Sequence, residues 1–201
     1  MQTLPLFPLS QPIFPEGVVR LTIFEVRYLH LIKHCQQEGI EFGIVPLADG
    51  HEVQKAGALE RLHAIGCLVK LLTVEAIQPA VLSVACVGTA RFRLGEYARG
   101  AFGLWSGEII LGPPPARLPI PAEFQPLADQ LGSLIAAAQQ QGLESNLPMR
   151  PPYRLDESGW VADRWAELLP LPAREKAMLL AEHDEIQRLQ RIANWLPAAS
   201  P

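Results

Sequence analysis

The chain has 201 residues, of which 49% are hydrophobic and 19% are charged, and its formal net charge is −4. This hydrophobic content is sufficient for a sizeable core, so the sequence predicts one domain or two small domains packed together. The negative charge argues against a dominant surface for nucleic acid or for an acidic membrane, because both bind through a positive excess.

The sequence carries no sign of secretion or of membrane insertion. No basic N-terminal segment precedes an apolar run with a cleavage site, and no apolar stretch reaches the roughly 20 residues that cross a bilayer. Cys35, Cys67 and Cys86 are far apart and never in a Cys-x-x-Cys arrangement, so neither a disulfide framework nor a zinc ribbon is expected. We therefore expect a soluble, cytoplasmic protein.

From Thr3 to about Leu111 the apolar residues come in short runs between Gly and Pro, a pattern typical of strands. The runs 65–74 and 81–87 flank a Gln-Pro turn and predict a hairpin. Alternation over 89–94 and the apolar run 102–111 predict two further strands.

One helix is expected within this strand-rich half, over residues 27–37, with Gly39 as its stop. His30 and His34 lie one turn apart on it, a spacing that can place two imidazoles on one metal. No third ligand is evident apart from Cys35, which points elsewhere on the helix. The sequence therefore predicts no metal and no cofactor.

Helical spacing begins after the proline cluster 113–115. A helix is expected from about Pro121 to Gly142, followed by a proline-rich connector over 143–153. A shorter helix should end at Pro170, and a last helix should run without a break from Pro172 to Pro197. We expect His183 on the apolar stripe of that helix, and we expect its charged residues to be solvated: Glu182, Asp184, Glu185, Arg188 and Arg191.

Several ordered motifs resemble the N-terminal domain of the Lon proteases. They are Leu4-Pro5-Leu6-Phe7-Pro8-Leu9, Ile23-Phe24-Glu25 with Arg27-Tyr28, Phe42-Gly43-Ile44-Val45-Pro46, Ile65-Gly66, and Gly88 with Arg91-Phe92-Arg93-Leu94. The chain departs from the family at two turns, where Pro15-Glu16-Gly17 replaces Pro-Gly and the Gln78-Pro79 region replaces a glycine.

The resemblance implies an α+β fold, with a PUA-like, mostly antiparallel pseudo-barrel and one helix over residues 1–116 and a helical subdomain over 117–201. It also implies a substrate-recognition module that contacts unfolded or tagged polypeptides. Docking to a separate ATPase or protease is a further alternative that is compatible with this function. The ATPase and peptidase that usually follow this domain have no visible counterpart here.

Motifs for catalysis are not found in the sequence. No Gly-Lys-Ser or Gly-Lys-Thr is present, which excludes ATP hydrolysis through a P-loop. The segment 103–107 has its serine one position too late for a nucleophile elbow. Ser83 and Lys70 could face each other across the hairpin, but burial among strand neighbours is the simpler interpretation. We therefore expect a non-enzymatic binding module.

Aromatic and flexible side chains outside the regular stripes are the candidate partner-binding residues, because such groups dominate the energy of binding surfaces. They are Phe102, Trp105, Met149, Tyr153 and Trp160. In the Lon-like motif we expect structural roles instead. Phe24 should anchor the core, Glu25 and Arg27 should pair at a helix start, and the Tyr28 hydroxyl should face a partner group.

RNA binding is the alternative function, because PUA-like barrels also occur in RNA-modifying proteins. Arg91 and Arg93 share one strand face, with Arg99 nearby, and could form a phosphate track. A solvated strand face explains the same pattern, so we expect polypeptide rather than nucleic acid as the partner.

Overall fold

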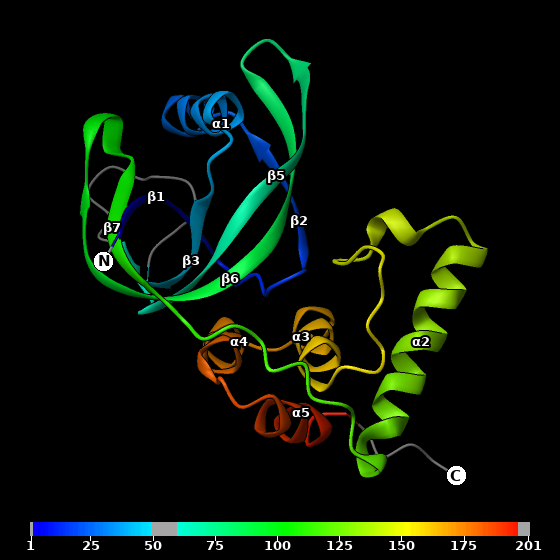
Figure 1. Ribbon diagram of the computed structural model, residues 1–201. Coiled ribbons are helices and arrows are strands. Elements are labelled where there is room, and N and C mark those ends of the chain that lie inside the picture. The colour runs from blue at the N-terminus through cyan, green and yellow to red at the C-terminus, as the bar shows by residue number, and fades with distance from the viewer. Residues whose placement is uncertain (1, 50–59, 197–201) are drawn as a thin grey trace.

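The computed structural model describes residues 2–49 and 60–196, in which a barrel of strands is followed by a group of helices (Figure 1). The strands are β1 (Gln2–Leu9), β2 (Val18–Ile23), β3 (Phe42–Asp49), β4 (Arg61–Leu62), β5 (Ile65–Gln78), β6 (Val81–Arg99) and β7 (Trp105–Leu111). The helices are α1 (Val26–Glu38), α2 (Gln125–Gln140), α3 (Ser158–Leu168), α4 (Ala173–Ala181) and α5 (Glu185–Ala193). Short 3-10 turns are η1 (Ala101–Gly103), η2 (Ala122–Phe124) and η3 (Glu144–Asn146).

The barrel closes through its first strand. The order β1-β7-β6-β5-β3 returns to β1, because β1 pairs antiparallel with β7 and parallel with β3. Strand β2 lies outside this ring, and among the described strands it pairs only with β6. The expectation of a mostly antiparallel barrel with one helix, followed by helices, is confirmed, and this arrangement is compatible with a PUA-like fold.

Strand β6 is longer than the sequence predicts. The expected strands 81–87 and 89–94 are one continuous strand, with Gly88 inside it and opposite Val69. The hairpin turn lies at Pro79–Ala80, one residue later than the predicted Gln78-Pro79, and Ala80 takes a positive φ of 60°. The pairing of β5 with β6 shifts register at three places, and such irregularities bend a strand enough to let it serve two parts of a barrel.

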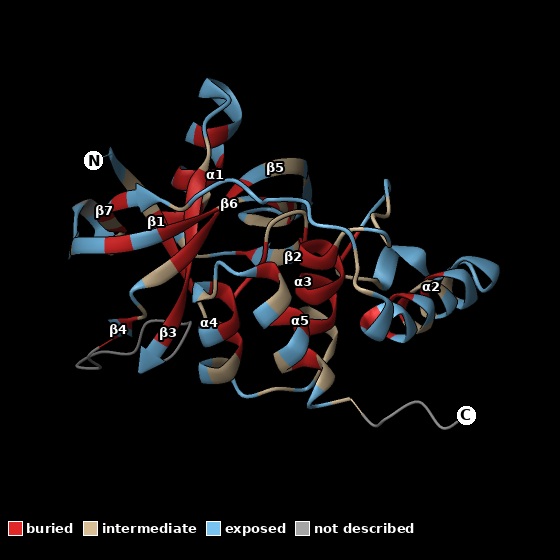
Figure 2. Ribbon diagram, turned by 60° about the horizontal axis from the view of Figure 1, so that its bottom comes forward, coloured by how far each residue is buried: buried red, intermediate tan, exposed pale blue. Residues whose placement is uncertain are grey.

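Helix α3 forms the centre of the helical part, and Figure 2 shows it buried along most of its length, whereas α2 exposes its outer face. The hydrophobic cluster around α3 draws residues from every helix except α1. It also includes Phe14, a fully buried residue from the loop between β1 and β2. The helices therefore pack onto the barrel through that loop.

The prediction that Arg91 lies on a wet strand face is wrong. Its guanidinium lies between barrel and helices, where Nη2 donates to both carboxylate oxygens of Asp163 at 2.6 and 2.7 Å. Its Nε donates to the carbonyl oxygen of Leu180 at 3.1 Å. Arg188 approaches the same Asp163 carboxylate at 3.0 Å. The alternation correctly separates two faces of the strand, but the helices cover the second face near Arg91, while Arg93 stays exposed.

The prediction of a single last helix is also wrong, because residues 182–184 are not helical and separate α4 from α5. The Asp184 carboxylate caps α5 by accepting hydrogen bonds from the backbone N–H groups of Ile186 and Gln187. Glu185 is buried and accepts from three backbone amides of the segment 116–118. Arg188 is buried as well, so two of the five charges expected to be solvated are not, and His183 is exposed in the break rather than half-buried on a stripe.

The motif at the end of β2 is confirmed in part. Glu25 and Arg27 form an ion pair at 3.0 Å at the start of α1. Phe24 is 52% exposed rather than a core anchor, because Ile23 points inward and the alternation turns the next side chain outward. The Tyr28 ring packs against that of Phe7, with 4.1 Å between the ring centroids. The buried Tyr28 hydroxyl makes no hydrogen bond to any residue that the structure describes, and burial raises the pKa of this hydroxyl.

Candidate functional site

Strand β2 has a free edge. The Gly17 carbonyl accepts a hydrogen bond from the Gly88 amide, so this carbonyl faces β6 at the start of the strand, while the Gly17 amide donates to the Phe14 carbonyl. Because successive residues of a strand direct their backbone groups to opposite edges, Val18, Arg20 and Thr22 direct theirs away from β6. The Val18 amide confirms this direction, since it donates to the Pro148 carbonyl at 2.9 Å.

The connector before α3 occupies one end of this edge. In addition to the bond between Val18 and Pro148, the Arg20 guanidinium donates to the Leu147 carbonyl at 3.4 Å. Beyond Leu147 the edge at Arg20 and Thr22 has no backbone partner among the described residues. The connector therefore already lies along one end of this edge, and the backbone groups of Arg20 and Thr22 remain available to a further extended segment.

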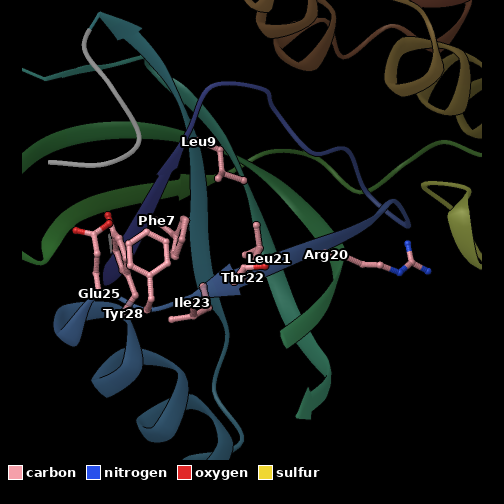
Figure 3. A pocket seen from close by; sticks show the side chains of 9 residues that line it. Phe7, Leu9, Arg20, Leu21, Thr22, Ile23, Glu25 and Tyr28 are labelled. Atoms are coloured by element: carbon pink, nitrogen blue, oxygen red, sulfur yellow. The ribbon is translucent and has the colours of Figure 1, made fainter. Parts of the chain in front are cut away.

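An apolar groove follows the free edge, and its first half is a cavity of about 210 Å³ between β1, β2 and the start of α1. Phe7 and Leu9 come from β1 and Leu21 and Ile23 from β2, while the Arg20 side chain points away from them (Figure 3). Glu25 and Tyr28 stand at the α1 end, next to the exposed Phe24. We call the whole hollow along the β2 edge the β2 groove.

The second half of the β2 groove is a cavity of about 320 Å³ that reaches the helices. It shares Leu9 and Leu21 with the first half, so the two are continuous. Its far end is formed by Pro148, Glu167 and Lys176, and the Lys176 ammonium donates to the Glu167 carbonyl at 3.1 Å.

Glu167 closes this end through several contacts with the first loop. Its carboxylate accepts from the Phe14 amide at 3.1 Å and from Arg164 Nε at 2.8 Å. It occupies the space that a Cβ of Gly17 would need. Burial raises the pKa of the Glu167 carboxyl to about 7, while Arg164 and the Phe14 amide favour the charged form and limit the rise.

Comparison with known proteins decides the family. Residues 3–197 match the ATP-dependent protease La (LON) substrate-binding domain. The chain belongs to this family. The resemblance that the sequence motifs indicate is therefore confirmed, and the matched domain is a substrate-binding one.

Solved structures of Lon N-terminal domains share this fold. A Lon N-terminal domain protein from Xanthomonas campestris has 29% sequence identity with the chain and a TM-score of 0.78, with 98% of this chain and 100% of that one covered. The N-terminal domain of a Mycobacterium avium complex Lon protease has 19% sequence identity and a TM-score of 0.64, with 96% of this chain and 97% of that one covered. At this identity the similarity supports the fold alone. No curated protein matches the chain.

The five predicted binding residues of this Lon domain do not form one surface. Phe102 is 77% exposed, with a φ of 57°, and lies edge-on to His30 at 5.8 Å between ring centroids. Trp105 is buried in the barrel and donates to Glu60 at 2.9 Å. Met149 and Trp160 are buried in the helical cluster, and Tyr153 packs against Trp160.

The residues of the β2 groove were missed by the sequence analysis. The signal available was the alternation of Arg20 and Thr22 with Val19, Leu21 and Ile23, which marks a strand with one polar face. That signal does not reveal which edge of the strand is free, because the pairing of β2 with β6 is fixed by residues far away in the sequence.

Neither the serine–lysine pair considered from the sequence nor a metal-ligand cluster forms among the described residues. Ser83 lies opposite Glu75 and Lys70 opposite Val87, so the serine and the lysine are not a pair. Within residues 2–49 and 60–196, no three His, Cys, Asp or Glu side chains gather in a way that could hold a metal ion. Burial raises the pKa of the Cys35 thiol to about 11 and those of Cys67 and Cys86 to about 12, which keeps all three protonated near neutral pH. No helix in the same ranges combines the length and hydropathy that crossing a membrane requires.

Proposed function

We propose that the protein is a non-enzymatic recognition module that binds extended, apolar segments of unfolded polypeptides in the β2 groove. The free β2 edge beside an apolar groove is the observation that carries this proposal. An incoming segment adds a strand to that edge through the backbone groups of Arg20 and Thr22, and its alternate side chains enter the groove. Backbone bonding supplies affinity without regard to sequence, which suits a module with many substrates.

The groove lining supports an apolar client. Its floor is made of Phe7, Leu9, Ile13, Val18 and Leu21, and burial of apolar surface against it contributes about 25 cal/mol per Å². Phe24 and Val26 extend the apolar surface beyond the α1 end, since they are 52% and 60% exposed. The exposed Phe102 is a further contact in this proposal, whereas the packing of Trp105, Met149 and Trp160 makes them supports of the fold.

Replacement of Thr22 by proline tests the strand addition. Proline removes the outward amide of Thr22, which β6 does not use, and edge positions of a sheet tolerate proline. We expect Thr22→Pro to weaken the binding of a labelled, permanently unfolded polypeptide about tenfold in fluorescence anisotropy, which corresponds to loss of about 1.4 kcal/mol. Thr22→Ala keeps the amide and is the matched control, with affinity expected within twofold of the wild type.

Two outcomes would contradict the proposal. A folded Thr22→Pro variant, checked by its thermal unfolding, that binds as tightly as Thr22→Ala would exclude strand addition at this edge. Binding of single-stranded RNA that weakens steeply with salt, with no binding of the unfolded polypeptide, would favour the nucleic-acid alternative instead. The ion pair of Arg91 with Asp163 removes one of the three arginines of the expected phosphate track, whereas Arg93 stays exposed.

A role in protein quality control, a separate ATPase or protease as partner, and a cytoplasmic location stay predictions of this proposal. A pull-down with the unfolded polypeptide present and absent tests the partner, because a recognition module that delivers clients should bind its ATPase in both conditions.

A further inference from the structure

A second cavity, of about 490 Å³, lies where the barrel meets α4, away from the β2 groove. Its wall comes from the start of β5, from β6, from α4 and from the break between α4 and α5. The lining residues are His63, Ala64, Ile65, Arg93, Arg174, Ala177, Met178, Ala181 and His183. We call it the α4 cavity. Its size lies within the range of about 300–1,000 Å³ that is typical of small-molecule sites.

Every polar side chain that lines the α4 cavity is basic. Arg93, Arg174, His63 and His183 contribute donors, and no acidic residue among those that the structure describes lines the cavity, although the whole chain carries a formal charge of −4. Among the residues that the structure describes, none of these four side chains makes a hydrogen bond or an ion pair, in contrast to the tightly paired Arg91. Unpaired guanidinium groups that face one hollow are a site for an anion.

His63, on the barrel side of the cavity, lies close enough to Arg174, on the helix side, for the two to interact electrostatically. Burial lowers the pKa of His63, Asp49 raises it, and the Arg174 guanidinium lowers it further. Arg174 belongs to α4 and His63 to the segment between β4 and β5, so these two side chains line opposite walls of the cavity and still interact electrostatically.

The floor of the cavity is apolar. Ala177 and Ala181 lie one helical turn apart on α4, and their small side chains leave space beside the helix. Ile65 and Met178 flank this space, and Met178 is 47% exposed. Methionine adapts its shape to varied apolar groups. The cavity therefore offers a cationic mouth over an apolar floor.

We propose that the α4 cavity binds a small organic carboxylate that carries an apolar side chain. The two guanidinium groups take the carboxylate, the imidazole N–H groups of His63 and His183 add donors, and the apolar part packs on Ile65 and Met178. A free amphipathic acid and the C-terminal carboxylate of a polypeptide with an apolar last residue share this chemistry. The proposal does not depend on strand addition at β2.

Histidine imidazole signals in NMR spectra make the test specific for the site. We expect N-acetyl-leucine to shift the signals of His63 and His183 in a saturable manner and to leave those of His30 and His34 on α1 unchanged. N-acetyl-leucinamide, which lacks the charge, should shift neither pair. The variant R93Q/R174Q should weaken the binding of N-acetyl-leucine at least tenfold, whereas R150Q, which removes an exposed charge on the connector, should not change it.

Further probes separate the sources and the ways in which the proposal could fail. A peptide that ends in leucine and binds as tightly as N-acetyl-leucine would assign the site to chain termini, and exclusion of the peptide would assign it to free acids. Equal binding of acid and amide, tighter binding of inorganic phosphate, or unchanged binding in a folded R93Q/R174Q variant would overturn the proposal. The Thr22→Pro variant should bind N-acetyl-leucine normally, so failure at one site is distinguishable from failure at the other.

Discussion

Gly88 shows how one residue can set the distance between β6 and the first loop. A Cβ at this position would overlap the carbonyl oxygen of Phe14, which is backbone and cannot rotate away. We expect Gly88→Ala to lower the free energy of unfolding by about 3 kcal/mol in urea denaturation, because either the strand or the loop must move. Gly95→Ala, in the same strand, is the control, since its nearest neighbour would be the Glu108 carbonyl oxygen at 3.4 Å. Equal stability of the two variants would show that the loop adjusts without cost.

The buried carboxyl of Glu167 makes the free energy of unfolding depend on pH. Burial raises its pKa from 4.5 to about 7 in the folded state, so the folded protein holds this proton more tightly than the unfolded chain. The resulting stabilisation is complete below pH 4.5 and is lost as the pH rises through 7. Relative to Glu167→Gln, the wild type should lose about 2–3 kcal/mol of unfolding free energy between pH 5 and pH 8, from 1.36 kcal/mol per unit of pKa. A difference that is flat or that grows with pH in the same urea titrations would show that Arg164 keeps the carboxylate charged throughout.

At the scale of single elements, the sequence predicts those whose pattern is local. The alternation around Phe92 and Leu94 correctly places both in the core, and Gly39 ends α1 as a left-handed cap. The apolar spacing after Pro172 continues through the break at Glu182–Asp184, so periodicity alone predicts one helix. Asp184 could have indicated the start of a new helix, since aspartate is among the best N-caps. The helical spacing of apolar residues continues across this position, however, and predicts an unbroken helix whether or not Asp184 is a cap.

The candidate site depends on pairings that no local pattern contains. Leu9 and Leu21 are recognisable as strand residues, but their place in one groove depends on β1 pairing with β7 and β3 while β2 pairs with β6. The aromatic candidates are hard to sort from the sequence for a related reason, because size and apolarity favour burial as much as binding. Trp105 and Trp160 are buried, Tyr153 is partly buried, and Phe102, in a turn with a positive φ, is exposed.

At the scale of the whole molecule, the barrel and the helices share charges that neither part could bury alone. Asp163 on α3 pairs with Arg91 on β6 at 2.6 Å and with Arg188 on α5 at 3.0 Å, and all three side chains are at most 8% exposed. Arg164 adds a hydrogen bond to the Pro15 carbonyl at 2.9 Å. A boundary at residue 116, as the sequence predicts, would cut a chain whose two parts depend on each other for counter-charges.

We therefore expect the protein to unfold in one transition that both parts share. In a Trp105→Phe variant the remaining tryptophans, 160, 165 and 195, all lie in the helical part, so their fluorescence follows the helices while far-UV circular dichroism follows the whole chain. The two urea curves should coincide.

Asp163→Asn should shift both curves together and lower the unfolding free energy by about 3–5 kcal/mol, because it leaves two buried guanidinium groups without a counter-charge. Asp49→Asn, which removes an exposed pair with Arg61 at 3.6 Å, should cost less than about 1 kcal/mol. Two separated transitions in the parent variant would mean that barrel and helices are independent domains, and the ion pairs between them would then contribute to orientation alone.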